Sequence, residues 1–265
     1  MSDQQIQLMH GDCLEIMALI PDGSVDLIVT DPPYPVISGG AVKAKPRGAP
    51  GMSPYSVIAK NDGLIFKHNN ILPSDYLPHF YRILKPDADL YLMTNNLNLR
   101  EFLNAAHEAG FKLHNMLAWN KVSCCPNRWY QKNLEWTLYL YKGRAKTINN
   151  PGSSQLFTCP NPRNKQHPCE KPVELMSHYI LNSSQPGDTV CDPFMGSAPA
   201  AESCLLHHRR FIGIEKDSEY FASAQNRMRN TTPSLFLPAD LLESPPPSEQ
   251  MLLSLRHDPC LDVAA

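Results

Sequence analysis

Short apolar runs alternate with helix-like segments along most of the chain, and this alternation restricts its fold more than any other feature. Runs of roughly four to eight apolar residues between turn signals predict buried strands. The predicted strands cover residues 25–30, 88–94, 111–119, 134–141, 188–192 and 210–215, with a further short strand at 5–9. The predicted helices cover residues 13–20, 74–84, 96–109, 172–182, 198–207 and 217–229. This order is typical of an α/β fold with a mostly parallel sheet and helices on both faces.

Capping signals mark several of the predicted helix starts. Asp12 and Asp217 each precede a helical segment, as N-cap residues do. Ser74 is a candidate N-cap as well, although Pro78 falls inside the segment that follows. Pro172 fits the first helical position, where its missing N–H leaves no helical hydrogen bond unmade.

The length of 265 residues suits one main domain, which we predict over residues 1–232. Residues 35–70 and 143–170 lack periodicity and are predicted to be long loops, which are usually functional in a compact domain. Residues 233–265 are predicted to be a tail that is partly disordered, because the sequence becomes rich in Pro and Ser there.

Cysteine spacing and hydropathy exclude several classes of protein. The eight cysteines form no C-x-x-C pair, so zinc-ribbon spacing is absent and we expect no metal site. The N-terminal residues lack the basic and apolar regions of a signal peptide, and no apolar stretch approaches the ~20 residues of a membrane span. We therefore expect a cytoplasmic protein with free thiols and no membrane partner.

Positive charge is concentrated in two segments of a chain whose formal net charge is −2. Residues 36–70 and 121–146 are basic, whereas acidic residues gather near both ends of the chain. This distribution fits an enzyme with one cleft that faces DNA, and it fits an ordinary solvated surface equally well. The candidate DNA-contacting residues are Lys43, Lys45, Arg47, Arg128, Trp129 and Lys132. For Trp129, stacking on DNA and a structural role are equal alternatives.

The most informative motif, DPPY at residues 31–34, directly follows the predicted strand VDLIVT. It therefore lies at the carboxyl end of a strand, where α/β sheets bind ligands. Asp31 offers a carboxylate, Pro32 a carbonyl on a stiffened backbone and Tyr34 a flat ring. A base with an exocyclic amino group needs two hydrogen-bond acceptors and an aromatic face, and these residues supply all three. A turn with Asp as turn former explains D-P-P alone better, but not D-P-P-Y after a buried strand.

A second motif, DPFMGS at residues 192–197, also follows a predicted strand and precedes a helix. A glycine turn in that position brings the backbone close to a ligand. Glu215 ends the next predicted strand, where an acidic side chain can bind the ribose hydroxyls of a nucleoside. The patterns G-x-G-x-x-G and G-x-x-x-x-G-K-[ST] are both missing from the sequence, which argues against NAD, ATP and an oxidoreductase.

Two further segments are ambiguous when each is taken alone. Lys171 lies just before the predicted helix at 172–182, and a helix N-terminus with a nearby lysine attracts a carboxylate. A plain loop that leads into a helix is an equal alternative. Asp12, next to Cys13, is more simply explained as a helix cap, but it could accept a hydrogen bond from an adenine amino group instead.

Five short motifs follow one another along the chain: GDC (11–13), DPPY (31–34), KP (171–172), DPFMGS (192–197) and GIE (213–215). Their order resembles the beta group of DNA amino-methyltransferases, and most closely the bacterial and phage site-specific N6-adenine enzymes. The resemblance covers residues 5–230. It implies the Rossmann-like methyltransferase fold with a seven-stranded sheet and one antiparallel strand. It also implies S-adenosyl-L-methionine as cofactor and double-stranded DNA as partner, in a cytoplasmic, nucleoid-associated enzyme.

The same resemblance assigns roles to individual residues. The catalytic residues would be Asp31, Pro32, Pro33 and Tyr34. Asp31 and the Pro32 carbonyl would hold the target amino group, and Tyr34 would stack on the flipped base. The residues that would bind the cofactor are Asp12, Cys13, Asp31, Lys171, Asp192, Pro193, Phe194, Gly196, Ser197 and Glu215. Asp12 and Cys13 would lie near the adenine of the cofactor, and Lys171 near its carboxylate. Residues 35–70 and 120–168 would contact DNA and set the sequence preference.

Alternatives to this interpretation stay open in the sequence. N4-cytosine methylation shares the local geometry, but in this family D-P-P-Y leans toward adenine and S-P-P-Y toward cytosine, so Asp31 favours adenine. A catalytically impaired DNA-binding homologue is the other alternative, because Ala198 stands where the family has a third glycine. Its methyl group would lie where the backbone approaches the cofactor, and we expect at most weaker cofactor binding. Family members are often dimers, so a homodimer is one expectation, whereas the recognition sequence and any partner restriction enzyme are not encoded here.

The chemistry of the amine predicts the order of the steps. A carboxylate with a reference pKa of about 4 is too weak a base to deprotonate the neutral amine, so methyl transfer should precede proton loss. The base must first leave the duplex, which costs a few kcal/mol, and stacking on Tyr34 would return roughly 1–3 kcal/mol of that.

Overall fold

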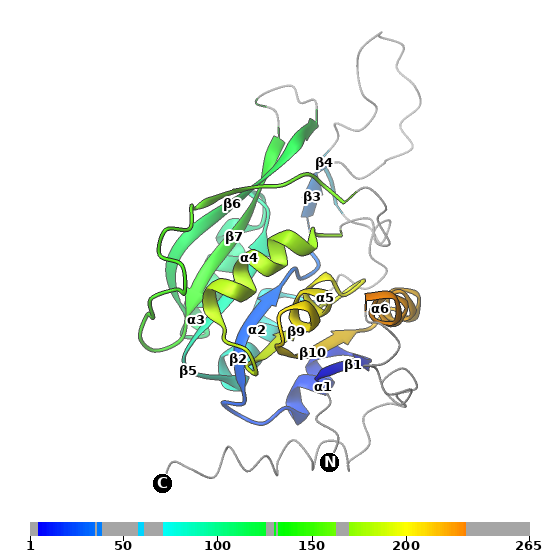
Figure 1. Cartoon of the computed structure of the whole chain (residues 1–265). Helices are drawn as coiled ribbons and strands as arrows, with labels where there is room; N and C mark the ends of the chain where they lie inside the picture. Colours follow the sequence, from blue (N-terminus) through cyan, green and yellow to red (C-terminus); the bar gives the residue numbers. More distant parts are fainter. Residues whose placement is uncertain are drawn as a thin grey trace.

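The structure of the chain is a computed structural model that describes residues 5–34, 36–38, 58–60, 71–125, 130, 132–162 and 170–231. An eight-stranded sheet forms its centre, in the order β1-β10-β9-β2-β5-β7-β6-β8 (Figure 1). The strands are β1 (Ile6–His10), β2 (Val25–Thr30), β5 (Leu84–Thr94), β6 (Lys112–Cys125), β7 (Lys132–Tyr141), β8 (Leu156–Thr158), β9 (Thr189–Asp192) and β10 (Arg210–Glu215). β7 runs antiparallel to both of its neighbours, β5 and β6, while the other pairs are parallel. The predicted mostly parallel sheet with one antiparallel strand is confirmed.

The expected count of seven strands is wrong, because β8 adds an eighth. β8 is three residues long and pairs with β6, with Phe157 opposite Trp119. Such a short run shows no alternation of apolar and polar residues, so the sequence predicts a loop there. The predicted loop at 35–70 is wrong in the same way at β3 (Val36–Ser38) and β4 (Ile58–Lys60), which pair antiparallel. The rest of that segment and the predicted tail at 233–265 lie outside the described residues.

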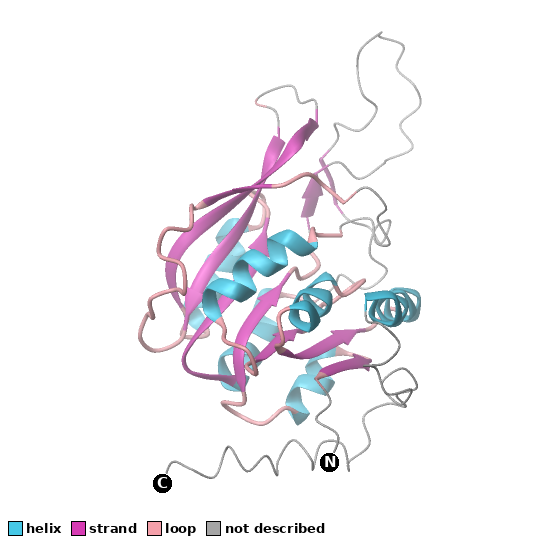
Figure 2. Cartoon of the chain, viewed as in Figure 1, coloured by secondary structure: helices cyan, strands magenta, loops and turns pink. Residues whose placement is uncertain are grey.

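Helices cover both faces of the sheet, as predicted (Figure 2). On one face lie α1 (Cys13–Leu19), α2 (Pro73–Ile83) and α3 (Leu99–Glu108), and on the other lie α4 (Val173–Ser183), α5 (Pro199–Leu206) and α6 (Ser218–Thr231). Successive residues of β2 point to opposite faces, so Ile28 joins the apolar core under α1–α3 while Leu27 and Val29 join the core under α4–α6. In the described ranges, no helix has the length and apolar character needed to cross a bilayer.

Two of the predicted helix caps are present. The Asp12 carboxylate accepts a hydrogen bond from the Leu14 N–H at 2.9 Å and caps α1. The Asp217 carboxylate accepts from the Glu219 N–H at 2.9 Å and so caps α6. Both side chains satisfy backbone donors that a helix start leaves without a partner.

The predicted starts of the other two helices, at Ser74 and Pro172, need correction. Ser74 is not a cap: α2 begins one residue earlier, at Pro73, and Leu72 occupies the N-cap position. A proline at the first helical position loses no hydrogen bond, so the helix starts there in preference to Ser74. Pro172 is the N-cap of α4 and not its first helical residue, which is Val173.

The middle of the sheet contains a point where the chain turns in opposite directions. β2 and β9 are neighbours, with Ile28 opposite Cys191. From β2 the chain passes through α2 to β5 on one side, and from β9 it passes through α5 to β10 on the other. The carboxyl ends of β2 and β9 therefore open a crevice between them, which is where open α/β sheets bind ligands.

Candidate active site

A cavity of about 340 Å³ lies at this crevice. Its walls come from the carboxyl ends of β2, β9 and β10, the start of α1 and the segment before α4. All ten residues that the sequence predicts to bind the cofactor line it: Asp12, Cys13, Asp31, Lys171, Asp192, Pro193, Phe194, Gly196, Ser197 and Glu215. Its volume lies in the range of small-molecule sites, roughly 300–1,000 Å³. The fold thus brings residues as far apart in the sequence as Asp12 and Glu215 to one cavity.

Two carboxylates belong to the cavity wall, that of the buried Asp192 and that of the partly buried Glu215. Asp192 accepts hydrogen bonds from the Thr30 hydroxyl at 2.6 Å and from the Phe194 N–H at 3.1 Å. Burial raises the pKa of Asp192 to about 7, against the effect of these hydrogen bonds and with a contribution from the charges of Asp31 and Glu215. Burial likewise raises the pKa of Glu215. A ligand that carries positive charge or hydroxyl donors would relieve both groups.

The turn after β9 is held by Glu215. Its carboxylate accepts from the Gly196 N–H at 3.0 Å and from the Asp217 N–H at 2.8 Å. Each carboxylate oxygen has a second lone pair, so both can still accept from a ligand hydroxyl. Gly196 has a φ of 54°, a left-handed conformation that glycine adopts without steric cost.

Ala198 affects the backbone and not the cavity. Ser197 and Pro199 on either side line the cavity, whereas the Ala198 side chain is fully buried in the apolar core. The expectation that its methyl group approaches the cofactor is therefore wrong. Ala198 has a φ of 60° and a ψ of 47°, a left-handed conformation that costs an L-residue about 1–2 kcal/mol.

One polar atom of the cavity wall supports a fit to a hydroxylated ligand. Ser197 Oγ is buried and has no hydrogen-bond partner among the described residues. A buried hydroxyl without a partner loses about 1–3 kcal/mol, which a ligand can restore. Together with the carboxylates of Asp192 and Glu215 and the ring of Phe194, it suits a nucleoside that carries a positive charge.

The DPPY motif lies beside this cavity. The Tyr34 hydroxyl donates to Asp31 Oδ1, and the Lys171 ammonium forms an ion pair with Asp31 Oδ2. The Tyr34 ring packs edge-on against Phe102 of α3, with ring centroids 6.0 Å apart. Pro33 and Asp31 also line the cavity, so the segment after β2 contributes both to the cavity wall and to the polar contacts around Tyr34. Pro32 is buried between them.

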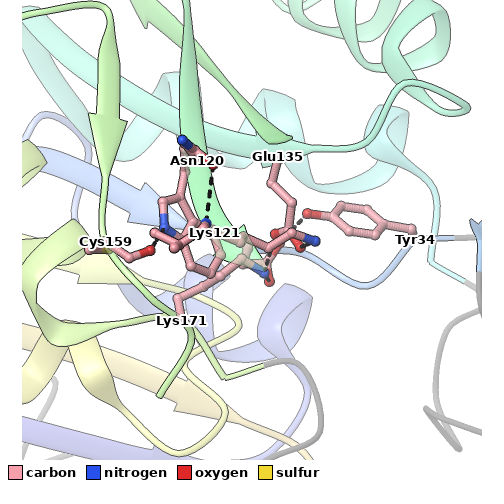
Figure 3. A network of polar contacts seen from close by, with 9 residues as sticks. Tyr34, Asn120, Lys121, Glu135, Cys159 and Lys171 are labelled. Atoms are coloured by element: carbon pink, nitrogen blue, oxygen red, sulfur yellow. Dashed lines mark hydrogen bonds and ion pairs between the residues drawn. The ribbon is translucent and has the colours of Figure 1, made fainter. Parts of the chain in front are cut away.

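Lys171 is positioned differently from the expectation. Its ammonium is directed at two carboxylates of the protein, Asp31 and Glu135, with the Glu135 oxygen at 3.4 Å (Figure 3). Glu135 lies within β7, and the sequence did not single it out, because a glutamate in an alternating strand is usually a solvated residue. The lysine that is expected to bind a ligand carboxylate thus pairs with Asp31, the predicted catalytic carboxylate.

The cavity is lined by one more basic residue, Lys216, which sequence reasoning missed. Lys216 directly follows Glu215 and pairs with Asp12 at 2.9 Å. The ammonium of Lys216 lowers the pKa of Asp12 although burial opposes this. Burial raises the pKa of the neighbouring Cys13 thiol to about 12, so Cys13 contributes a neutral surface and no nucleophile. A basic residue right after the strand-end acid is the signal that could have pointed to Lys216.

Five of the six candidate DNA-contacting residues lie outside the described residues: Lys43, Lys45, Arg47, Arg128 and Trp129. Lys132 is described, and it begins β7, partly exposed and opposite Cys125 of β6.

The family model for N6 and N4 methyltransferases, described as DNA methylase, matches residues 25–226. This chain belongs to that DNA methylase family. The family depends on S-adenosylmethionine, and a structurally similar protein, M1.HpyAVI, was solved in complex with it. The predicted DNA amino-methyltransferase and its cofactor are thereby confirmed at the level of the family.

Individual relatives agree with this membership. The Type II methyltransferase M2.MboI of Moraxella bovis is 24% identical over 272 residues, which cover 88% of this chain and 91% of the relative. The Type II methyltransferase M2.DpnII of Streptococcus pneumoniae is 26% identical over 243 residues, covering 83% and 88%.

Solved structures share the fold. The M1.HpyAVI–SAM complex has a TM-score of 0.62 and 25% identity, covering 84% of this chain and 99% of that one. The cytosine-N4-specific PvuII DNA methyltransferase has a TM-score of 0.63 at 18% identity, covering 95% of this chain and 91% of that one. The second likeness concerns the fold alone.

Proposed function

We propose that this chain transfers a methyl group from S-adenosylmethionine to N6 of a flipped adenine at a specific sequence in double-stranded DNA. The position of Asp31 carries the proposal, because its carboxylate lines the cavity and also accepts from the Tyr34 hydroxyl. A base held by Asp31 and Tyr34 lies next to a ligand held by Asp192 and Glu215. Such adjacency is what direct transfer between two bound groups requires.

The residues of the chain perform three tasks in this reaction. Bound S-adenosylmethionine supplies a methyl group that its sulfonium already activates. Asp31 and the Pro32 carbonyl accept the two N–H bonds of the target amine, which frees its lone pair from the ring. Asp31 then takes up the proton after methyl transfer, because a carboxylate is too weak to remove it beforehand. Tyr34 stacks on the extruded base and offsets part of the cost of flipping.

Adenine is favoured over cytosine by the first residue of the motif. Asp31 matches the D-P-P-Y form that leans toward adenine in this family, whereas the S-P-P-Y form leans toward cytosine. N4-cytosine methylation is the alternative target, since the same acceptors fit its amino group. Residues 35–70 and 120–168 would read the recognition sequence, and a homodimer that acts on nucleoid DNA in the cytoplasm completes the proposal.

The test is transfer of labelled methyl groups from S-adenosylmethionine to unmethylated bacterial DNA, followed by digestion to nucleosides and identification of the modified base. We expect N6-methyladenine. N4-methylcytosine would reverse the target, and no transfer to any base by protein that binds the cofactor would overturn the proposal.

The variant Asp31→Ala provides the internal control. Its methyl transfer should fall by about 100-fold or more, because the acceptor of the target amine is gone. Its affinity for S-adenosylmethionine should change little, since Asp192 and Glu215 are intact. Near-normal methylation by this variant would show that Asp31 does not hold the target.

A further inference from the structure

A line of four alternating charges runs from the catalytic aspartate into the sheet. The Lys171 ammonium contacts Asp31 and lies 3.4 Å from Glu135 Oε2, and the Lys121 ammonium lies 3.0 Å from Glu135 Oε1. Glu135 belongs to β7, Lys121 to β6, and Lys171 precedes α4. In Figure 3 the labelled side chains of Lys121, Glu135, Lys171 and Tyr34 gather in one network of polar contacts.

Three of these four charges are largely buried, and Glu135 is partly buried, so they differ from ordinary surface pairs. The exposed fraction of the side chain is 7% for Lys171, 17% for Asp31, 16% for Lys121 and 34% for Glu135. An ammonium without partners at such a depth would lose several kcal/mol of solvation. Burial opposes ionisation of Glu135, but the ammoniums of Lys171 and Lys121 outweigh it and hold its pKa below the usual range. Glu135 is therefore ionised at neutral pH.

The charge of Lys171 creates a difficulty for methyl transfer. The target nitrogen becomes positive when it accepts the methyl group, and the negative charge of Asp31 stabilises it. The ammonium of Lys171 against Asp31 repels that developing charge, and Coulomb interactions are strong in a partly buried site. The carboxylate of Glu135 also contacts Lys171, and its negative charge would offset this repulsion.

We propose that Glu135 is a positioning residue for methyl transfer, acting through Lys171 so that the negative charge of Asp31 stays available to the target amine. This inference rests on the proposed function. The competing explanation is a tether that joins β7 to the segment before α4 and has no part in the reaction.

The two explanations differ in what Glu135→Gln changes. This variant keeps the shape of the side chain and removes its charge. We expect kcat to fall about tenfold, while KM for DNA and the Kd for S-adenosylmethionine stay within about twofold. The matched control is Glu174→Gln, an exposed glutamate in the first turn of α4, which should leave all three quantities unchanged.

A double-mutant cycle shows whether Glu135 acts through Lys171. Once Lys171→Met has removed the ammonium, the added change Glu135→Gln should lower kcat by less than about twofold. Thermal unfolding of each variant confirms that it is folded, and each S-adenosylmethionine titration confirms that the cofactor site is intact.

The possible outcomes distinguish a failure of this inference from a failure of the proposed function on which it rests. A kcat of Glu135→Gln within twofold of the unaltered protein, or full additivity with Lys171→Met, would overturn the role of Glu135 alone. A loss that appears equally in kcat, cofactor affinity and unfolding temperature would also overturn it, in favour of the tether. No methylation by the unaltered protein would overturn the proposed function itself.

Discussion

The hydroxyl of Tyr34 gives this residue a second task besides stacking. The sequence predicts a ring beneath the target base, and the structure adds a hydrogen bond from the hydroxyl to Asp31 Oδ1. The hydroxyl therefore orients the predicted acceptor, while the ring, which packs edge-on against Phe102, is the part that we propose to support the base. Both parts of the side chain should contribute to the rate.

Replacing Tyr34 with Phe and with Ala separates these tasks. Tyr34→Phe should lower kcat/KM about ten- to hundredfold, because one hydrogen bond to a charged acceptor is lost. Tyr34→Ala should cost a further tenfold or more, because base stacking is worth roughly 1–3 kcal/mol. Steady-state methylation by both variants measures the difference, and Tyr141→Phe, at the end of β7, is the control. Equal losses from Phe and Ala would mean that the ring does not support the base.

Individual side chains show where prediction from sequence ends. Asp31, Asp192 and Glu215 could be predicted, because each comes directly at the end of a strand and such ends meet at one edge of a parallel sheet. Glu135 could not, because its partners come from β6 and from the segment before α4, and strand alternation says nothing about either. The conformation of Ala198 was also hidden, since a left-handed alanine is uncommon.

At the scale of elements, α6 supports the turn that lines the cavity. Its Arg227 donates to the Ser197 carbonyl at 2.7 Å and pairs with Glu202 at 2.6 Å and with Glu170. The Glu170 side chain is only 5% exposed and lines the cavity just before Lys171. One arginine thus joins α6, α5, the turn after β9 and the segment before α4.

The variant Arg227→Met tests this support. It should destabilise the protein by about 3–5 kcal/mol, because the buried Glu170 would lose its ion pair with Arg227. Affinity for S-adenosylmethionine should fall as well, since the peptide of Ser197 loses its donor. Denaturant unfolding and cofactor titration measure the two effects, with exposed Arg229→Met on the same helix as the control. An Arg227 variant as stable as the Arg229 variant would contradict the support role.

Long elements could be predicted and short ones could not. Within the described ranges, all six helices and seven of the eight strands of the main sheet follow from apolar periodicity, and β2 and β10 match to the residue. The strands β3, β4 and β8 are each three residues long, which is too short to show a hydrophobic period. Their pairing depends on partners elsewhere in the chain. β8, for example, is specified by the edge that β6 presents.

At the scale of the whole molecule, strand order brings like charges together. β2, β9 and β10 are consecutive in the sheet, so Asp31, Asp192 and Glu215 gather at one edge although they are far apart in sequence. Burial and mutual repulsion together raise the pKa of Asp192. A fold free of function would avoid this arrangement, and a positively charged cofactor relieves it. We therefore expect this site to lower the stability of the cofactor-free protein and to raise its affinity for the cofactor.

The variant Asp192→Asn tests this expectation, because the stability that it gains over the unaltered protein should depend on pH. Burial raises the pKa of Asp192 from 3.8 to about 7. The folded protein is therefore most stable below pH 3.8, where Asp192 is protonated in both the folded and the unfolded state. Its free energy of unfolding falls as the pH rises from 3.8 to about 7, because only the unfolded state then ionises freely. Asparagine stays neutral, and its carbonyl can still accept from Thr30 and the Phe194 N–H. The variant should thus gain about 2–3 kcal/mol over the unaltered protein between pH 5 and pH 8.5. Denaturant unfolding across this range measures the gain.

The affinity of the Asp192→Asn variant for S-adenosylmethionine at pH 8 should fall, because the negative charge in the cofactor cavity is gone. A stability difference that is constant with pH would mean that Asp192 ionises in the fold as it does in water, and that the gathered carboxylates exert no strain on the site.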